Sequence, residues 1–222
     1  MNRKNLSTYL ETAHVKAAVG VTTITTITCL VFGTTLGQTI LAILAVISAQ
    51  FSIGFSNNYF DRENDKKSGR KDKAIVNKVL RAKTVLIIAT LLLAISVVLS
   101  LSLDIRAGLI HLGAVAIAWS YNIGLKNTRL SILCYMAAFS IIPLFAAELA
   151  GNTASLLTVL SFAALGSTMH LLDALGDYEY DNKAGINGFP NSFPLATSEL
   201  ILKFSAVVFM VLSTSNIVAI TI

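Results

Sequence analysis

The chain has 222 residues, of which 55% are hydrophobic and only 13% are charged. A soluble domain carries about 25% charged residues, so this composition excludes an ordinary soluble protein and indicates an integral membrane protein. The net charge of +5 does not indicate a nucleic-acid-binding protein, because the basic residues flank apolar runs, as they do in loops that meet a membrane surface.

Long apolar runs follow one another along the chain, each close to the roughly 20 residues that a helix needs to cross a bilayer. They are too long and too uniformly apolar for the strands of a barrel. We therefore predict an all-α fold, a polytopic transmembrane helical bundle that forms one domain over residues 1–222. The first run has full length and follows a polar N-terminus, so a cleaved signal peptide is not expected. The seven predicted spans lie near residues 18–36, 38–60, 84–103, 105–123, 131–150, 154–175 and 203–222.

The basic residues are distributed on one side of these spans. If the N-terminus lies inside, the inside segments carry 16 of the 17 Lys and Arg residues, and the outside segments carry only Arg106. By the positive-inside rule, this bias predicts a cytoplasmic N-terminus and cytoplasmic loops at 61–83 and 173–198. We therefore expect a multi-pass protein of the plasma membrane whose functional loops face the cytoplasm.

Two sets of polar side chains with the same spacing lie where predicted spans end. One set follows the second span and the other follows the sixth, and neighbours within each set are four residues apart. On a helix, this spacing places them along one face. A single acid at a helix end is usually just solvated, but two matching sets beside the bilayer indicate function. The sets are Asn57, Asp61 and Asp65, and Asp173, Asp177 and Asp181.

These oxygen ligands indicate a site for a hard divalent cation. Carboxylates 4 Å apart repel by roughly 4 kcal/mol at an effective dielectric constant of about 20, so they need bound cations or raised pKa values. Mg²⁺ fits, because it binds few carboxylates and completes its shell with water and phosphate, and Mn²⁺ is the alternative. Zinc is not expected, since neither set contains His or Cys. Arg70, Lys73 and Lys126 are suited to a diphosphate, although membrane orientation alone also predicts basic loops.

Three segments resemble motifs of the UbiA superfamily of intramembrane prenyltransferases. Residues 57–65 resemble its first aspartate-rich motif, N-D-x-x-D-x-x-x-D, and residues 177–185 resemble the second, D-x-x-x-D-x-x-A-G. Residues 121–126 resemble the tyrosine-to-lysine stretch that ends the family's fourth helix, and the three segments follow the family's order. The sequence departs from the pattern at Asn58, where Asp is usual, and it offers seven spans where family members usually have nine.

The resemblance implies a UbiA-like fold and the transfer of an isoprenyl group. The donor would be an isoprenoid diphosphate and the acceptor an aromatic quinone precursor or another compound, with Mg²⁺ assisting departure of the diphosphate. The implied catalytic residues are Asp61, Asp65, Asp177 and Asp181, and the implied metal ligands are these four and Asn57. The implied substrate-binding residues are Asn57, Asn58, Arg70, Lys73, Tyr121, Lys126 and Asp173.

The matching ends of the second and sixth spans also predict two pseudo-related four-helix units, of which the second is incomplete. Two alternative functions remain, a non-catalytic truncated relative and a small-solute membrane transporter. A transporter typically has broken helices or polar residues at mid-membrane, which the first, third and seventh spans lack. Aromatic side chains that face the interior are candidates for stabilising a carbocation by cation–π contact. These candidates are Tyr59, Phe60, Trp119, Tyr121 and Phe162.

Overall fold

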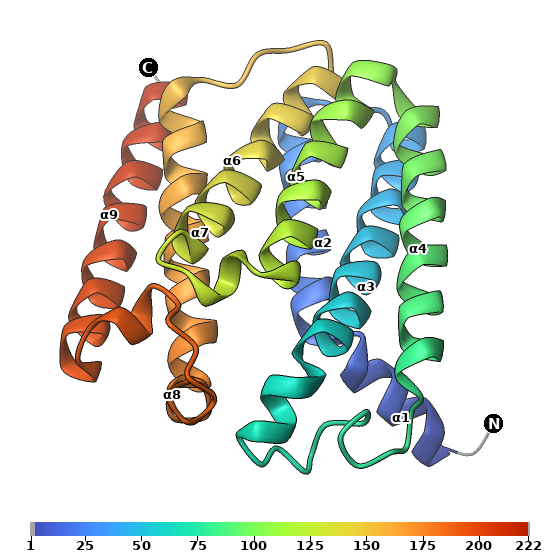
Figure 1. Cartoon of the computed structure of the whole chain (residues 1–222). Helices are drawn as coiled ribbons and strands as arrows, with labels where there is room; N and C mark the ends of the chain where they lie inside the picture. The colour runs from blue at the N-terminus through green and yellow to red at the C-terminus, as the bar shows by residue number, and fades with distance from the viewer. Residues whose placement is uncertain (1–2, 222) are drawn as a thin grey trace.

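The computed structural model describes residues 3–221, with side chains described from 7 to 215, and shows a bundle of roughly upright helices (Figure 1). The helices are α1 (Arg3–Thr12), α2 (Val15–Phe32), α3 (Leu36–Lys67), α4 (Ala82–Leu103), α5 (Ile105–Ile123), α6 (Ser131–Leu149), α7 (Leu156–Gly176), α8 (Tyr178–Ala184) and α9 (Leu195–Thr221), with 3-10 turns at Leu125–Asn127 and Pro190–Ser192.

The predicted all-α bundle is confirmed, and every predicted span coincides with a helix. Within the described residues, α2, α3, α4, α6, α7 and α9 are long and apolar enough to cross a membrane. The fourth predicted span, α5, is less apolar because it carries His111 and Asn122, which are both buried. Neighbouring helices satisfy these side chains, since His111 Nδ1 lies 2.8 Å from Ser100 Oγ and Asn122 Nδ2 donates to Ile53 O at 2.9 Å. His111 and Asn122 therefore face protein rather than lipid.

Two helices extend beyond the predicted spans. The α3 helix continues past residue 60 to Lys67, so it carries the whole first set of polar residues on one helix, as predicted. The α9 helix begins at Leu195 rather than near residue 203. The last residue of that predicted span, Ile222, lies outside the described residues. The predicted pair of four-helix units stays a prediction.

The second set of acids does not lie on one continuous helix, and this part of the prediction is wrong. Asp173 belongs to α7, which ends at Gly176, and Asp181 belongs to the short α8. Asp177 stands at the junction with φ −105° and ψ 4°. Glycine is a poor helix former, at about 1 kcal/mol relative to alanine, so Gly176 favours a break at this point. After the break, α8 lies below the end of α7 in Figure 1, where it is seen nearly end-on, and it contacts α3.

The helices are held together by small residues and hydrogen bonds rather than by apolar burial alone, as expected in a membrane. Ser52 Oγ of α3 donates to Ala89 O of α4 at 2.8 Å. A Cβ at Gly166 of α7 would lie 2.5 Å from Tyr135 O of α6, so only glycine permits the observed approach of these helices. This contact fixes the position of the segment of α6 that carries Tyr135.

The end of the bundle opposite the acidic residues is packed solid. Its buried cluster draws on α2, α3, α5 and α6, and the partly buried Val21, Phe32, Leu103 and Ile110 pack against it. The cavity of the protein lies between this cluster and the acidic residues. The members of the cluster are Cys29, Ala42, Val46, Ala107, Phe145, Ala146 and Leu149.

Candidate active site

A cavity of about 400 Å³ lies between α2, α3, α5, α6 and α7 and is polar at one end and apolar at the other. Its volume is within the range of small-molecule sites, roughly 300–1,000 Å³. The polar mouth lies at the end of the bundle that carries α8 and the loop after α3. The apolar interior is lined by side chains that include Ile24, Val46, Ile53, Val115, Phe139, Ile142 and Phe145.

The first set of polar residues lines one side of the mouth from α3. Asn57, Asp61 and Asp65 all face the cavity. Lys126, in the 3-10 turn after α5, reaches across to them. Its Nζ donates to Asn57 Oδ1 at 3.2 Å and forms an ion pair with Asp61. Both partners of the ion pair are mostly buried, with 10% and 18% of their side chains exposed, so the pair is only weakly screened by solvent.

The second set faces the same mouth from α7 and α8, and Arg70 links it to the loop after α3. Arg70 Nη1 lies 2.9 Å from Asp177 Oδ2, and its guanidinium stacks on the ring of Tyr180. Burial opposes the charge on Arg70, but the hydrogen bond and charge of Asp177 outweigh it and raise the pKa of Arg70. Burial, followed by the negative charges of Asp177 and Asp61, raises the pKa of Asp181 to about 7. A cation at this end would therefore be favoured.

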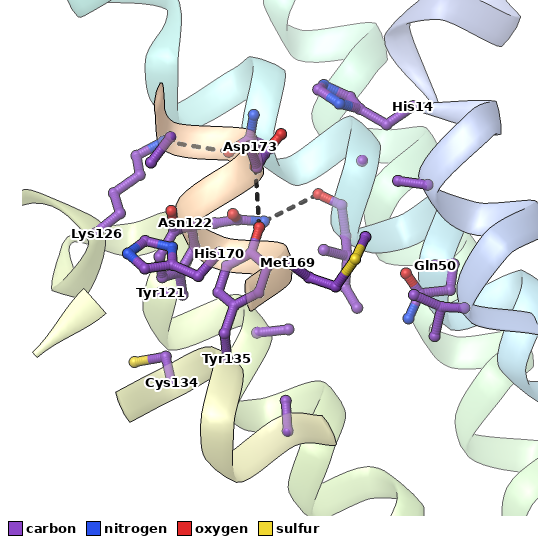
Figure 2. A pocket seen from close by; sticks show the side chains of 18 of the residues that line it. His14, Gln50, Tyr121, Asn122, Lys126, Cys134, Tyr135, Met169, His170 and Asp173 are labelled. Carbon is purple, nitrogen blue, oxygen red and sulfur yellow. Dashed lines mark hydrogen bonds between the residues drawn. The ribbon is translucent and has the colours of Figure 1, made fainter. Parts of the chain in front are cut away.

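Aromatic side chains form the wall below the second set. Tyr135 Oη donates to Asp173 Oδ2 at 3.0 Å, and the rings of Tyr121 and Tyr135 meet edge to face with centroids 5.2 Å apart. His170 packs against Tyr135 at 4.9 Å. Figure 2 shows these residues on one wall of the cavity, with Gln50 of α3 apart from them.

His170 also ties this wall to the loop that follows α8. Its Nε2 lies 3.1 Å from Ser131 Oγ, which accepts a hydrogen bond from Phe189 N at 2.9 Å. The buried Ser131 hydroxyl thus connects the imidazole of His170 to the main chain of the loop. The Nδ1 atom is buried without a partner in the structure.

The structure brings together nearly all residues that the sequence analysis selected. The exception is Asn58, which does not line the cavity. It is 5% exposed and its amide donates to Thr12 O at 2.9 Å and to Gly54 O at 3.2 Å. It therefore joins α3 to α1 and is not placed to bind substrate, which corrects the expectation. The residues that do line the cavity are Asn57, Asp61, Asp65, Arg70, Lys73, Tyr121, Lys126, Asp173, Asp177 and Asp181.

Most of the aromatic candidates are placed elsewhere. Phe60 packs edge to face on Tyr59 at 5.2 Å and on Trp119 at 6.3 Å, away from the cavity lining. Phe162 does not line the cavity either, so of the five candidates only Tyr121 does. Periodicity within an apolar helix does not show which face meets a cavity, since all faces are apolar.

Many residues of the cavity lining were not selected from the sequence as binding residues, and Tyr135, His170 and His14 are three of them. Tyr135 is one of many aromatic residues within apolar spans, and no motif marks it. His170 is a histidine within an apolar span, where a histidine that is hydrogen-bonded in the interior is the usual case. His14 lies at the α1–α2 junction with φ 52°, and burial followed by the charge of Lys73 lowers its pKa. Its position at the mouth depends on the turn between α1 and α2.

The donor chemistry of the mouth fits a hard divalent cation, since carboxylate and amide oxygens from both sets face the same space. Within the described residues, no three His, Cys, Asp or Glu side chains approach closely enough to hold a metal as they stand. Lys126 and Arg70 instead neutralise one acid of each set. A bound cation would therefore have to replace these ion pairs.

Comparisons with known proteins agree with this geometry. A sequence profile described as the UbiA prenyltransferase family matches residues 17–222, and no curated protein sequence matches significantly. Structures of a UbiA homolog from Archaeoglobus fulgidus, one bound to GPP and Mg²⁺ and one bound to Cd²⁺, superpose with TM-scores of 0.80 and 0.74. Both are 17% identical over 92% of this chain, and the matches cover 76% of the relative.

A third solved structure, described as digeranylgeranylglyceryl phosphate synthase in membranes, superposes with a TM-score of 0.70 at 18% identity, over 97% of this chain and 78% of that one. The fold and cavity define a multi-pass helical membrane protein with an amphipathic internal site. The match over nearly the whole chain makes it a member of the UbiA prenyltransferase family.

Proposed function

We propose that this protein transfers an isoprenyl group from an isoprenoid diphosphate to an acceptor within the membrane. The observation that carries the proposal is one cavity that has two sets of acids and four basic residues, Lys16, Arg70, Lys73 and Lys126, in its lining and a largely apolar interior. Such a cavity matches a ligand with a highly charged head and a hydrocarbon tail. The relative from Archaeoglobus fulgidus described as bound to GPP and Mg²⁺ supports this choice.

The residues at the mouth have distinct proposed roles. Asn57, Asp61 and Asp65 would hold one Mg²⁺ and Asp177 and Asp181 a second. The ions, when bound, would neutralise charge on the leaving diphosphate. Arg70, Lys73 and Lys126 would contact the phosphate oxygens as charge-assisted donors. These roles require Lys126 and Arg70 to exchange a carboxylate for a phosphate, which both can do because their side chains line the same mouth.

The reaction divides between the two halves of the cavity. The bond between the allylic carbon and the diphosphate oxygen breaks, and its electron pair leaves with the diphosphate, where the basic residues stabilise the negative charge. The acceptor then bonds to the allylic carbon and loses a proton, which an oxygen of the departed diphosphate takes up. The apolar walls exclude water, and the rings of Tyr121 and Tyr135 face the space where the cation forms, so they stabilise it by cation–π contact. The proposed acceptor is an aromatic precursor of a quinone or another nucleophile that can enter the cavity.

The transporter alternative receives less support. The buried cluster that includes Phe145 and Leu149 fills the bundle opposite the mouth, so the cavity has no continuation along the bundle axis. Alternating access would require this solid half to open.

The experiment that tests the proposal measures binding of labelled geranyl diphosphate to the protein in lipid nanodiscs, followed by turnover against a panel of acceptors. We expect binding and turnover that need Mg²⁺ or Mn²⁺, are lost with EDTA and are not restored by zinc, since the ligands are all oxygen. Binding that is unaffected by exhaustive EDTA treatment would refute the metal site. The absence of prenyl diphosphate binding under all conditions would refute the function.

The proposed membrane orientation has its own test. We expect the loops at Ser68 and Asn187 to be cytoplasmic and Asn152 to be external, because 16 of the 17 basic residues then lie inside. Single cysteines at these positions are labelled in intact cells with a membrane-impermeant reagent. Labelling at position 68 but not at position 152 would reverse the orientation.

A further inference from the structure

One acid in the lining of the cavity has no basic partner. Lys126 and Arg70 each pair with an acid of the mouth, but no ion pair among the described side chains includes Asp173. Asp173 lies on α7, four residues before Asp177, which places it one helical turn, about 6 Å, further from the mouth. Its carboxylate therefore lines the cavity between the charged mouth and the apolar interior.

Asp173 instead accepts a hydrogen bond from a tyrosine. Tyr135 Oη donates to Asp173 Oδ2 at 3.0 Å (Figure 2), so the outer end of the tyrosine ring is tied to a carboxylate. The ring also packs edge to face against Tyr121 at 5.2 Å and parallel to Phe139 at 6.4 Å. The imidazole of His170 lies against it at 4.9 Å. Because both its hydroxyl and its ring are held, Tyr135 has a fixed orientation in the wall of the cavity.

A hydrogen bond to a carboxylate changes the charge distribution of a phenol as well as its orientation. The hydroxyl shares its proton with the anion, which increases the negative charge on the phenol oxygen and, through it, on the ring. The face of a more electron-rich ring attracts a cation more strongly. The carboxylate of Asp173 therefore strengthens the attraction between Tyr135 and a cation in the cavity without touching that cation.

We propose that Asp173 is a positioning residue that acts through Tyr135, whose ring it orients and polarises so that the ring stabilises the allylic cation when the diphosphate departs. This inference rests on the proposed function, since it needs an isoprenoid diphosphate to ionise in the cavity. With the diphosphate held at the mouth, the allylic carbon lies just inside it, at the level of Asp173 and Tyr135. The role differs from that of the acids at the mouth, which would bind metal.

The test separates binding of the donor from cleavage of its carbon–oxygen bond, and it needs no acceptor. Geranyl diphosphate with a heavy oxygen isotope in the bridging position is incubated with the protein in nanodiscs with Mg²⁺. When the bond between the allylic carbon and the bridging oxygen breaks, the electron pair stays on the diphosphate. Rotation of the phosphoryl group and recombination then move the label to a non-bridging position, which phosphorus NMR detects. Water that captures the cation instead gives an alcohol and a proton, so label exchange and alcohol release together measure the rate of cleavage.

We expect Asp173→Asn and Tyr135→Phe each to slow cleavage about tenfold or more, because a cation–π contact in a desolvated site contributes enough for such a factor. The dissociation constant of geranyl diphosphate should stay within about threefold, since neither group contacts the diphosphate. Because Asp173 acts through Tyr135, the double variant should be little slower than the poorer single variant.

The matched controls are Glu179→Gln and Tyr178→Phe, which should change neither the rate of cleavage nor the affinity by more than about twofold. Glu179 is an exposed acid on α8, and Tyr178 Oη donates to Phe193 O at 2.9 Å, as Tyr135 Oη donates to its own acceptor. Neither control residue lines the cavity.

Several outcomes would overturn the inference. Weaker binding of Mn²⁺ or of the donor by Asp173→Asn would make Asp173 a metal ligand, and unchanged cleavage with a loss of transfer to an acceptor would make it a base for the acceptor. Losses that multiply in the double variant would show that the two residues act separately. If Asp173→Asn does not fold, Tyr135→Phe carries the test alone, since it leaves every carboxylate in place, and unchanged cleavage in that variant would overturn the inference.

The unaltered protein separates this inference from the proposed function. Geranyl diphosphate that binds but is never cleaved without an acceptor would show that the cavity does not generate the cation by itself, which would overturn the inference alone. Failure of geranyl diphosphate to bind at all would instead refute the proposed function.

Discussion

Replacement of Lys126 by methionine is expected to change metal binding and diphosphate binding in opposite directions. In the structure, Lys126 pairs with Asp61 and donates to Asn57 Oδ1, so a metal at these two oxygens must first displace the ammonium group. Methionine keeps the length of the side chain but removes the charge and the donors. The free carboxylate is then available to the metal, while the diphosphate loses one of its charged partners.

The size of the expected changes in affinity follows from the burial of the ion pair between Lys126 and Asp61. Side-chain exposures of 10% and 18% place it between a surface pair and a fully buried one. A hydrogen bond to a charged group contributes about 1.5–3 kcal/mol, and about 1.4 kcal/mol corresponds to a factor of ten in affinity. We therefore expect Lys126→Met to bind metal alone about tenfold more tightly and to bind geranyl diphosphate in excess metal at least tenfold more weakly.

The assay follows free Mn²⁺ by its electron paramagnetic resonance signal during titration of the protein in nanodiscs, without diphosphate and then with it. Arg129→Met is the matched control, because Arg129 is an exposed basic residue three positions further along the same loop. The control should change neither affinity by more than about twofold, since an isolated surface charge contributes little. Weaker metal binding by Lys126→Met without diphosphate would refute the assignment of Asp61 and Asn57 as metal ligands.

Three other substitutions test the shared site and the packing that supports it. Asp61→Asn and Asp177→Asn should each reduce turnover at least a hundredfold, and the double variant should be little worse than the poorer single one, because both acids serve one leaving group; independent, multiplying losses would contradict a shared site. Gly54→Ala should lower the melting temperature by several degrees, because its Cβ would lie 2.3 Å from a main-chain carbonyl of the α1–α2 turn and overpacking costs about 1–3 kcal/mol. Gly20→Ala, with no atom within 4 Å of its Cβ, is the control, and an equal loss there would contradict the packing argument.

The polar residues of the mouth could be predicted because they are exceptional in an apolar sequence. Asp61, Asp65 and Asp181 are conspicuous in a chain of 55% hydrophobic residues. Acidic side chains beside a bilayer are energetically costly, so their presence indicates a function. Their helical spacing also predicted that the first set shares a face of α3, which the structure confirms. The same reasoning did not find the break at Asp177, since a glycine such as Gly176 is tolerated within many helices.

Pairings across the bundle could not be predicted from the sequence. Lys126 and Asp61 are 65 residues apart, and Arg70 and Asp177 are further apart still. Lys126 meets Asp61 because the 3-10 turn after α5 docks beside α3. Arg70 meets Asp177 because α8 lies beside the loop that carries Arg70. Asn58 shows the reverse case, since it stands within the acidic motif but turns to Thr12 O because α1 lies against that side of α3.

The sequence by itself determined the class of molecule, the number and place of its apolar helices and the chemistry of one end, because length, apolarity and charge act locally along the chain. The tertiary structure decided which faces of those helices enclose a cavity, where that cavity ends and which aromatic residues meet it. In helices that are apolar on all sides, lipid, neighbouring helices and cavity offer similar surroundings to a side chain. The hydrophobic pattern of the sequence alone therefore cannot distinguish Phe145, which lines the cavity, from Phe162, which does not.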